Sequence, residues 1–468
     1  MALTLLGALL RLPTLGHQSL WLDELYTRWL AGLDLDRMFE EIPRSERTPY
    51  LYYIAEWVSV RIGGSGEAGL RALSAFAGVA TIPVAYLAGA RLSSRLAGLV
   101  TALLVSVNPF LVWYSQEARS YALVVFLVTV ALACFAEARR GSRAWLVAWA
   151  AVSGLALATH YFAMFVLVPQ AALLLWRSQL PRRLTAAALT VPLAVVLFHV
   201  RLLHRQSGGG VDLGADPLLR RLVGTVKDFA VGYSFPLEGP GSLVALALVA
   251  TGALLATRLR GPQREGTLVA AAIGAAGLAV PVALALVGGD YIVPRNLIVA
   301  LVPILVALGG AYAGSRVGLI AAALLSVLSL AVVLAVSSDL RYGRSDWRGA
   351  GRALPADGRP RALVVSPTVR TDLIQPYLPG VEAITDPIQV RSIVVVSLAT
   401  EGGLSSGAVI PPSPSPGVVP PGFRLASTRQ APTFSLAVFT AEETRVVTPE
   451  QLDRLRFTDD PARLFLQR

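Results

Sequence analysis

"RVGLIAAALLSVLSLAVVLAVS" (residues 316–337) decides the fold class, because it is too long and too apolar for the surface of a soluble domain. A helix needs about 20 predominantly apolar residues to cross the hydrocarbon core of a bilayer. Similar stretches precede it at about 72–90, 96–113, 119–137, 144–159, 161–176, 184–203, 241–257, 267–287 and 295–314. The pattern predicts an α-helical polytopic membrane protein.

The N-terminal stretch "MALTLLGALLRLPTLG" (residues 1–16) adds a shorter candidate, which brings the prediction to about 11 transmembrane helices. It has too few apolar residues before Arg11 to cross the core alone, and it lacks the basic start and cleavage site of a signal peptide. We therefore expect a first transmembrane helix whose start is truncated or mis-assigned, with Arg11 extending to the membrane interface.

Composition supports a membrane protein, with 54% hydrophobic and 15% charged residues, against about a quarter charged in soluble domains. The formal charge of +11 could indicate nucleic acid, but the arginines lie in short linkers between apolar stretches, so no nucleic-acid partner is predicted. The single cysteine, Cys134, excludes an intrachain disulfide, and the four histidines lack metal-ligand spacing. No obligatory cofactor is expected, although a divalent metal is not excluded.

The linkers between apolar stretches alternate in character. Five are rich in arginine: "ARLSSR" (90–95), "RRGSR" (139–143), "RSQLPRR" (177–183), "RLRGPQRE" (258–265) and "GSR" (314–316). The linkers between them hold carboxylates and aromatic residues: 16–71, 114–119, 159–161, 204–240 and 288–296. The positive-inside rule places the first set in the cytoplasm, so the second set and the C-terminal tail are predicted to face outward. The bias toward Arg and Ala suggests a bacterial plasma membrane.

Residues 339–468 are predicted to form a small extracytoplasmic α/β domain beyond a transmembrane domain of residues 1–338. Two β-branched runs indicate strands, "RALVVSPT" (361–368) and "SIVVVSLAT" (392–400). "FRLASTRQAPTFSLAVFTA" (423–441) predicts a hairpin, and "TDLIQPYL" (371–378) and "TPEQLDRLRF" (448–457) predict short helices. Thr448 is the expected N-cap of the last helix, with Gln451 three residues later.

Asp23 and Glu24, in "SLWLDELYTRW" (19–29), lie in the first predicted outward loop, which spans residues 16–71. Apolar neighbours strengthen a carboxylate as a base, so the pair is a candidate for catalysis. The alternative is a helix N-cap or a solvated interfacial acid.

Two arginines are candidates for binding phosphate. Glu117 and Arg119 start a helix in "YSQEARSYAL" (114–123), where backbone N–H groups favour an anion; the alternative is a local Glu–Arg pair. Arg295, in "GDYIVPRNL" (289–297), also opens a helix; the alternative is an interfacial arginine held by Asp290.

Three further candidates are His160, Tyr161 and Tyr52. His160 and Tyr161 occupy a very short outward turn, where a lone histidine is more often packed than catalytic. Tyr52 belongs to "ERTPYLYYIAEW" (46–57), which suits an amphipathic helix on the membrane surface and could be an anchor without chemistry. Together, the candidates suit a reaction in which a lipid-held phosphate leaves and a hydroxyl attacks.

These stretches resemble the polyprenyl-phosphate-sugar-dependent glycosyltransferases of the C superfamily. The similar enzymes are bacterial membrane proteins of glycosyltransferase family 39 type, both protein O-mannosyltransferase-like and aminoarabinose-transferase-like. The resemblance covers roughly residues 15–165. It is carried by "SLWLDELYTRWLA", "TPYLYYIAEWV", "LRALSAFAGVATIPVAYLAGARL", "AGLVTALLVSVNPFLVWYSQEARSYAL" and "ATHYF", and later by "DYIVPRNLIVALVPILVALG" and "DWRGAGRAL".

The resemblance implies an inverting transfer of a sugar, often mannose, from a polyprenyl phosphate to a protein, lipid or polysaccharide acceptor. It assigns acceptor activation to Asp23, with Glu24 beside it, and the lipid phosphate to Arg119 and Arg295. Many relatives have H-P-P-L-Y-Y where this chain has Thr48-Pro49-Tyr50-Leu51-Tyr52-Tyr53. The missing histidine puts the substrate in question.

Two other function classes compete with a transferase. A lipid-carrier transporter or flippase typically shows internal repeats and a site at the membrane midplane. The sequence shows no repeat, and its polar groups gather at one face. A non-catalytic cell-envelope assembly protein would not depend on Asp23.

Overall fold

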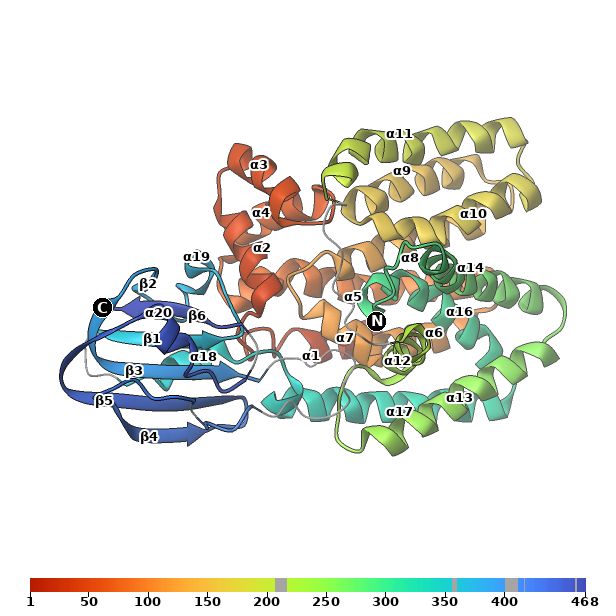
Figure 1. The fold of residues 1–468 in the computed structure, drawn as a ribbon. Coiled ribbons are helices and arrows are strands. Elements are labelled where there is room, and N and C mark those ends of the chain that lie inside the picture. The colour runs from red at the N-terminus through yellow and green to blue at the C-terminus, as the bar shows by residue number, and fades with distance from the viewer. Residues whose placement is uncertain (207–216, 356–359, 400–410, 416, 459–460) are drawn as a thin grey trace. The chain divides into compact units, whose positions relative to one another are not determined.

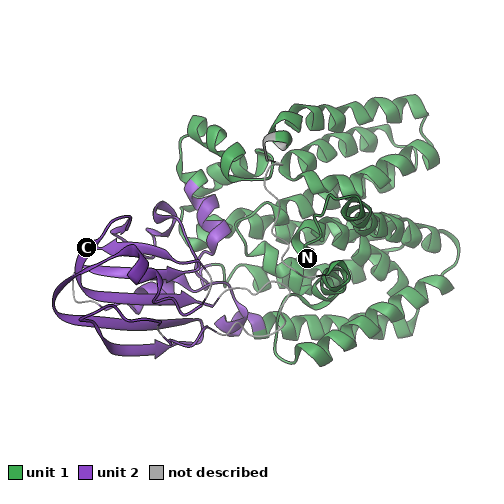
Figure 2. Ribbon diagram, in the orientation of Figure 1, with its two compact units in different colours: residues 1–15, 30–335 green, residues 16–29, 336–468 purple. Residues whose placement is uncertain are grey.

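The computed structural model describes residues 1–206, 217–355, 360–399, 411–415, 417–458 and 461–468. Its contacts divide the chain into two compact units (Figure 2). Unit 1 comprises Met1–Leu15 and Leu30–Ala335, and unit 2 comprises Gly16–Trp29 and Val336–Arg468. The short segment 16–29 of the first predicted outward loop is therefore grouped with the C-terminal part of the chain.

Unit 1 is helical (Figure 1). Its helices are α1 (Ala2–Arg11), α3 (Leu35–Ser45), α4 (Leu51–Gly63), α5 (Glu67–Leu92), α6 (Arg95–Val107), α7 (Pro109–Ser115), α8 (Tyr121–Ala138), α9 (Arg143–Thr159), η1 (Tyr161–Ala163), α10 (Met164–Arg177), α11 (Arg182–Gln206), α12 (Leu218–Val231), α13 (Glu238–Arg258), α14 (Gly261–Leu286), α15 (Pro294–Leu297), η2 (Ile298–Ala300) and α16 (Leu301–Tyr312). Helices α2 (Leu22–Gly32) and α17 (Arg316–Ser338) each begin in one unit and end in the other.

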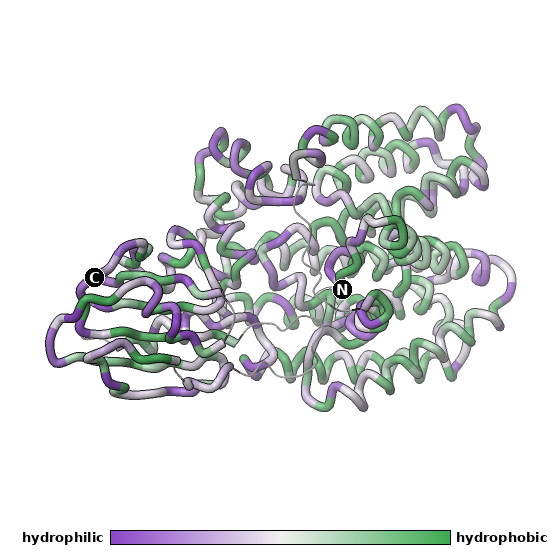
Figure 3. The backbone as a smooth tube through the Cα atoms, in the orientation of Figure 1, coloured by the Kyte–Doolittle hydropathy of each residue, from purple (hydrophilic) through white to green (hydrophobic). Residues whose placement is uncertain are grey.

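The predicted polytopic helical fold is confirmed. Within the described ranges, seven helices are long and apolar enough to cross a membrane, or eight if α6 and α7 form one span bent by 58°. Three shorter apolar helices, Ala2–Arg11, Arg143–Thr159 and Tyr161–Arg177, lie at the other predicted spans but are below the length of a full crossing, so the described residues hold fewer candidate spans than the predicted eleven. Hydrophobic residues run along the helices, and hydrophilic residues gather toward their ends (Figure 3).

The bend between α6 and α7 follows from Asn108 and Pro109. Proline has no N–H to continue the ladder of α6, but it suits the first position of a new helix. The Asn108 side chain caps α7, where its oxygen accepts a hydrogen bond from the Leu111 N–H at 2.9 Å. Its amide nitrogen donates to the Phe229 carbonyl at 2.8 Å and so ties the bend to α12.

Arg11 lies against this bend and is fully buried, so the predicted extension to the membrane interface is wrong. Its guanidinium donates to the carbonyls of Val105 at 3.1 Å and Ser106 at 2.8 Å, in the last turn of α6. It also donates to the Ser115 hydroxyl at 3.1 Å. A broken helix leaves carbonyls without intrahelical partners, and an apolar environment makes such carbonyls costly. Arg11 supplies their hydrogen bonds.

Unit 2 contains a six-stranded sheet in the order β2-β6-β1-β3-β5-β4. Its strands are β1 (Arg361–Ser366), β2 (Val381–Ala383), β3 (Ile388–Leu398), β4 (Arg424–Gln430), β5 (Phe434–Val447) and β6 (Arg463–Gln467). Strands β1 and β3 pair in parallel, and the other pairs are antiparallel. The two predicted strands are present as β1 and β3, and the predicted hairpin is present as β4 and β5.

Short helices complete unit 2: η3 (Leu340–Tyr342), α18 (Trp347–Arg352), α19 (Thr371–Ile374) and α20 (Pro449–Asp453). The predicted N-cap of α20 is present as a capping box. The Gln451 N–H donates to the Thr448 hydroxyl at 3.3 Å, and the Thr448 N–H donates to the Gln451 side chain at 3.0 Å.

Segment 16–29 is fastened within unit 2 by contacts on either side of Asp23. The Leu20 N–H donates to the Tyr377 hydroxyl at 2.7 Å, and the Ser19 hydroxyl donates to the Ser345 carbonyl at 3.0 Å. On the other side of Asp23, the Arg370 guanidinium lies 4.7 Å from the ring centre of Trp29. These contacts fix the first turn of α2.

Candidate active site

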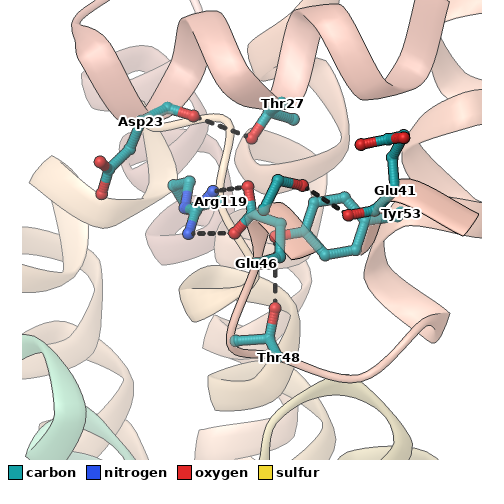
Figure 4. Close-up of polar contacts among 8 residues, drawn as sticks. Asp23, Thr27, Glu41, Glu46, Thr48, Tyr53 and Arg119 are labelled. Carbon is teal, nitrogen blue, oxygen red and sulfur yellow. Dashed lines mark hydrogen bonds and ion pairs between the residues drawn. The ribbon is translucent and has the colours of Figure 1, made fainter. Parts of the chain in front are cut away.

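The two carboxylates in the first turn of α2 have different surroundings. Glu24 is fully buried, and its carboxylate accepts a hydrogen bond from the Trp21 N–H at 3.3 Å. Glu24 is the third residue of α2, so this contact is the N3 half of a capping box and not an N-cap; the helix dipole also favours an anion here. Asp23 is only half-buried, and its backbone carbonyl accepts from the Thr27 hydroxyl at 3.2 Å (Figure 4). Asp23 is therefore the more accessible carboxylate of the pair.

Arg119 forms a two-pronged ion pair with Glu46, with both N–O distances at 2.9 Å (Figure 4). The side chain of Arg119 is 11% exposed and that of Glu46 is 4% exposed, so both charges are largely removed from water. The partner comes from the end of α3, 73 residues away in sequence. Sequence reasoning missed Glu46, although it is the first residue of the quoted stretch 46–57.

Tyr53 and Thr48 lie beside this ion pair. The Thr48 hydroxyl donates to the Tyr53 hydroxyl at 3.2 Å (Figure 4). Burial raises the pKa of the Tyr53 phenol well above its usual value, while Arg119 opposes the rise and Glu46 adds to it. Tyr53 therefore stays protonated and available as a donor. The Thr48 hydroxyl orders this phenol.

Tyr52 is also buried, on the same turn of α4 as Tyr53, and the two rings meet edge-on at 5.3 Å. Burial raises the pKa of Tyr52 well above its usual value, and the charge of Glu56 adds to the rise. Glu56 is fully buried on α4 and was not among the predicted site residues.

His160 caps η1 from the short turn between α9 and α10. Its Nδ1 accepts a hydrogen bond from the Phe162 N–H at 3.2 Å, and only 5% of the residue is exposed. Burial, followed by the charges of Arg119 and Arg295, lowers the pKa of His160 to about 3. The imidazole is therefore neutral and lies within electrostatic reach of both predicted phosphate-binding arginines.

Arg295 lies half-buried in α15, after a linker that is fastened to α12. In that linker Asp290 accepts hydrogen bonds from Arg221 at 3.0 and 2.5 Å, and the Ile292 carbonyl accepts a third at 3.1 Å. The guanidinium of Arg221 holds the pKa of Asp290 below its usual value. Arg221 lies in the predicted linker 204–240, and it binds Asp290, the carboxylate that was the alternative partner of Arg295. Residues 207–216 of that linker lie outside the described ranges.

The structure brings most of the predicted site residues into unit 1. Arg119 and Arg295 each act electrostatically on His160, and Arg119 also acts on Tyr52. Glu117 is buried two residues before Arg119, and Tyr161 is half-buried beside His160. Asp23 and Glu24 belong to unit 2. Among the described residues, no three His, Cys, Asp or Glu side chains gather closely enough to hold a metal ion.

Comparison with known families confirms the resemblance stated from the sequence. Residues 46–203 match the family described as dolichyl-phosphate-mannose-protein mannosyltransferase. The matched segment begins at Glu46 and contains Arg119 and His160, whereas Asp23, Glu24 and Arg295 lie outside it. This segment is thus related to membrane glycosyltransferases. No curated protein sequence matches the chain.

Several solved structures are similar at low identity. The oligosaccharyltransferase of Archaeoglobus fulgidus, in complex with zinc and sulfate, is 15% identical with a TM-score of 0.43. The alignment covers 76% of this chain but only 55% of the archaeal enzyme. ArnT from Cupriavidus metallidurans in the apo state is 13% identical with a TM-score of 0.38, over 93% of this chain and 97% of ArnT. A second ArnT structure, bound to undecaprenyl phosphate, is 14% identical with the same TM-score and coverage.

Proposed function

We propose that this chain is an inverting glycosyltransferase. It moves a sugar, mannose or another hexose or pentose, from a polyprenyl-phosphate carrier to an acceptor hydroxyl at the outer face of the membrane. The observation that carries the proposal is the buried Glu46–Arg119 ion pair, with the neutral His160 under the influence of Arg119, in the segment that matches the mannosyltransferase family.

Buried charge of this kind is costly in a membrane protein and usually serves a function. A polyprenyl phosphate presents its anionic group at the membrane surface, where guanidinium groups bind phosphate oxygens through paired hydrogen bonds. Arg295 and Arg119 are the proposed ligands of this phosphate. Both terminal nitrogens of Arg119 donate to Glu46 at 2.9 Å, so Glu46 orients the guanidinium before the donor arrives. Arg119 then binds the phosphate through its remaining N–H groups.

Asp23 is the proposed base. Its carboxylate takes the proton of the acceptor hydroxyl while the hydroxyl oxygen forms a bond to the anomeric carbon of the sugar. The bond between that carbon and the phosphate oxygen breaks, and its electron pair leaves with the phosphate. Attack opposite the leaving group inverts the anomeric configuration. The arginines stabilise the charge that grows on the departing phosphate.

Glu24 acts through Asp23. Its buried carboxylate accepts a hydrogen bond from the Trp21 N–H, and this contact fixes the first turn of α2. In the proposed topology this turn, the predicted outward linkers and the α/β part of unit 2 face the extracytoplasmic side of a bacterial plasma membrane. The partners are then the lipid-linked donor, the bilayer and a protein, lipid or polysaccharide acceptor.

The donor class is tested with purified full-length protein in proteoliposomes that contain membrane acceptors. Radiolabelled polyprenyl-phosphate sugars, beginning with mannose, are compared with the matching nucleotide sugars. We expect label to move only from polyprenyl-phosphate donors. Label that moves from nucleotide sugars, or from no donor in a panel of hexoses and pentoses, would contradict the proposal.

A further inference from the structure

His160 lies in the turn between α9 and α10. The role inferred for it below rests on the proposed function. We propose that His160 binds the phosphate of the polyprenyl carrier as a neutral hydrogen-bond donor, through its Nε2–H group. It thereby adds a hydrogen bond between the two arginines without adding a third positive charge.

The hydrogen bond to Phe162 fixes the tautomer of the ring. A backbone N–H can only donate, so Nδ1 of His160 must accept at the observed distance of 3.2 Å. A neutral imidazole carries one N–H, which therefore lies on Nε2. With Nδ1 occupied and Nε2 protonated, the ring has no lone pair with which to accept the proton of an acceptor hydroxyl. His160 is thus a donor and not a general base.

Aromatic contacts connect the turn that carries His160 to both linkers that carry the arginines. The ring centre of His160 lies 5.8 Å from that of Tyr121, which follows Arg119 by two positions. The neighbouring Phe162 ring lies 5.5 Å from that of Tyr291, in the linker that leads to Arg295. These two contacts agree with the electrostatic influence of both arginines on His160.

Burial and the two guanidinium groups explain why the histidine stays neutral. An imidazolium here would be desolvated and repelled by Arg119 and Arg295, and the pKa of His160 is accordingly about 3. A neutral N–H avoids that repulsion and still donates to an anion, in surroundings where such a bond is stronger than in water.

Two substitutions separate the two proposed functions of the ring, the hydrogen bond that Nδ1 accepts from Phe162 and the hydrogen bond that Nε2–H donates to phosphate. The amide of asparagine reaches the position of Nδ1, so His160→Asn can keep the cap on Phe162 but loses the distal N–H. The longer amide of glutamine reaches the position of Nε2, so His160→Gln keeps a neutral distal donor and loses the cap. The two variants therefore make opposite predictions for a phosphate-binding role and for a purely structural one.

The readout is binding of undecaprenyl phosphate to the full-length protein in lipid nanodiscs, with undecaprenol as the probe that lacks phosphate. We expect His160→Asn to weaken binding of undecaprenyl phosphate about tenfold, the size of a hydrogen bond to a charged group. We expect His160→Gln to stay within about threefold of wild type, and undecaprenol binding to be equal in all three proteins. Thermal unfolding of each variant reports the loss of the cap separately.

Binding that is unchanged in His160→Asn, or weakened equally in both variants, would overturn the role of His160 while leaving the proposed function intact. Wild-type protein that binds undecaprenol as well as undecaprenyl phosphate would instead contradict the phosphate site itself, and the inference with it.

A pH series adds a second test. Arg119 and Arg295 act on the ring and Tyr121 packs against it, and Arg and Tyr side chains ordinarily keep one charge state between pH 5.5 and 8. The carrier phosphate titrates at about pH 6, but it enters both affinities of the ratio. Because His160 is neutral throughout this range, the ratio of wild-type to His160→Gln affinity should be constant. A ratio that rises as the pH falls through about 6.5 would show an imidazolium and would contradict the proposal.

Discussion

At the scale of single residues, the Glu46–Arg119 pair shows how a buried charge is organised before a substrate binds. Its two hydrogen bonds of 2.9 Å hold a guanidinium that is only 11% exposed. Removing one partner of such a pair leaves the other charge buried without compensation. We therefore expect Glu46→Gln to lower the free energy of unfolding by about 3 kcal/mol and to reduce sugar transfer.

The matched control is Glu41→Gln. Glu41 also pairs with an arginine, Arg44 at 2.8 Å, but their side chains are 31% and 68% exposed. An exposed pair contributes less than about 1 kcal/mol, so this variant should unfold like wild type. Thermal unfolding in detergent measures both, and equal stability of the two variants would contradict a structural contribution of Glu46.

At the scale of elements, the close approach of α5 to α7 depends on Gly78. A Cβ atom at this position would lie 2.1 Å from the Ser115 hydroxyl oxygen and 2.7 Å from the Ser115 Cβ. Overpacking of this kind costs about 1–3 kcal/mol, so Gly78→Ala should destabilise the protein. The segment that carries Arg119 directly follows α7, so transfer should fall as well.

Gly32 in α2 provides the control, because a Cβ there would meet nothing within 4 Å and no proline follows it. Replacing a glycine by alanine in a helix ordinarily stabilises it by up to about 1 kcal/mol. Gly32→Ala should therefore be neutral or stabilising in the same unfolding assay. A Gly78→Ala protein that is as stable as Gly32→Ala would show that α5 and α7 are not tightly packed at this point.

Local patterns in the sequence predicted much of this architecture. The apolar stretches, the β4–β5 hairpin and the Thr448 capping box each depend on neighbouring residues, and each was found. The bend at Asn108-Pro109 also had a local signal, because proline ended α6 inside the predicted span 96–113. That signal was not used, so the role of Arg11 at the bend was missed.

Contacts between distant segments could not be derived in the same way. Glu46 reaches Arg119 across 73 residues, and Arg221 reaches Asp290 across 69. No spacing rule connects such positions, because tertiary packing alone decides which linkers meet. The difference between Glu24 and Asp23 was also hidden, since adjacent carboxylates look alike until their burial is known.

At the scale of the whole molecule, the alternation of linkers predicts which side of the membrane each faces. The buried Cys134 is first replaced by serine, and single cysteines are then introduced as Asp36→Cys and Arg264→Cys at two exposed positions. A membrane-impermeant thiol reagent added to intact spheroplasts should label the first and spare the second. Labelling of the second alone would invert the topology and would place Asp23 on the wrong side for the proposed donor.

The most direct test of the central claim is transfer of radiolabelled sugar from a polyprenyl-phosphate donor by wild type and by Asp23→Asn. The control variant, Asp36→Asn, removes an exposed carboxylate of the same predicted loop. If Asp23 is the base, its loss should lower transfer at least about a hundredfold, the lower range for general base catalysis. Asp36→Asn should transfer like wild type, and all three proteins should show the same thermal unfolding. Transfer that persists in a folded Asp23→Asn protein would contradict the mechanism.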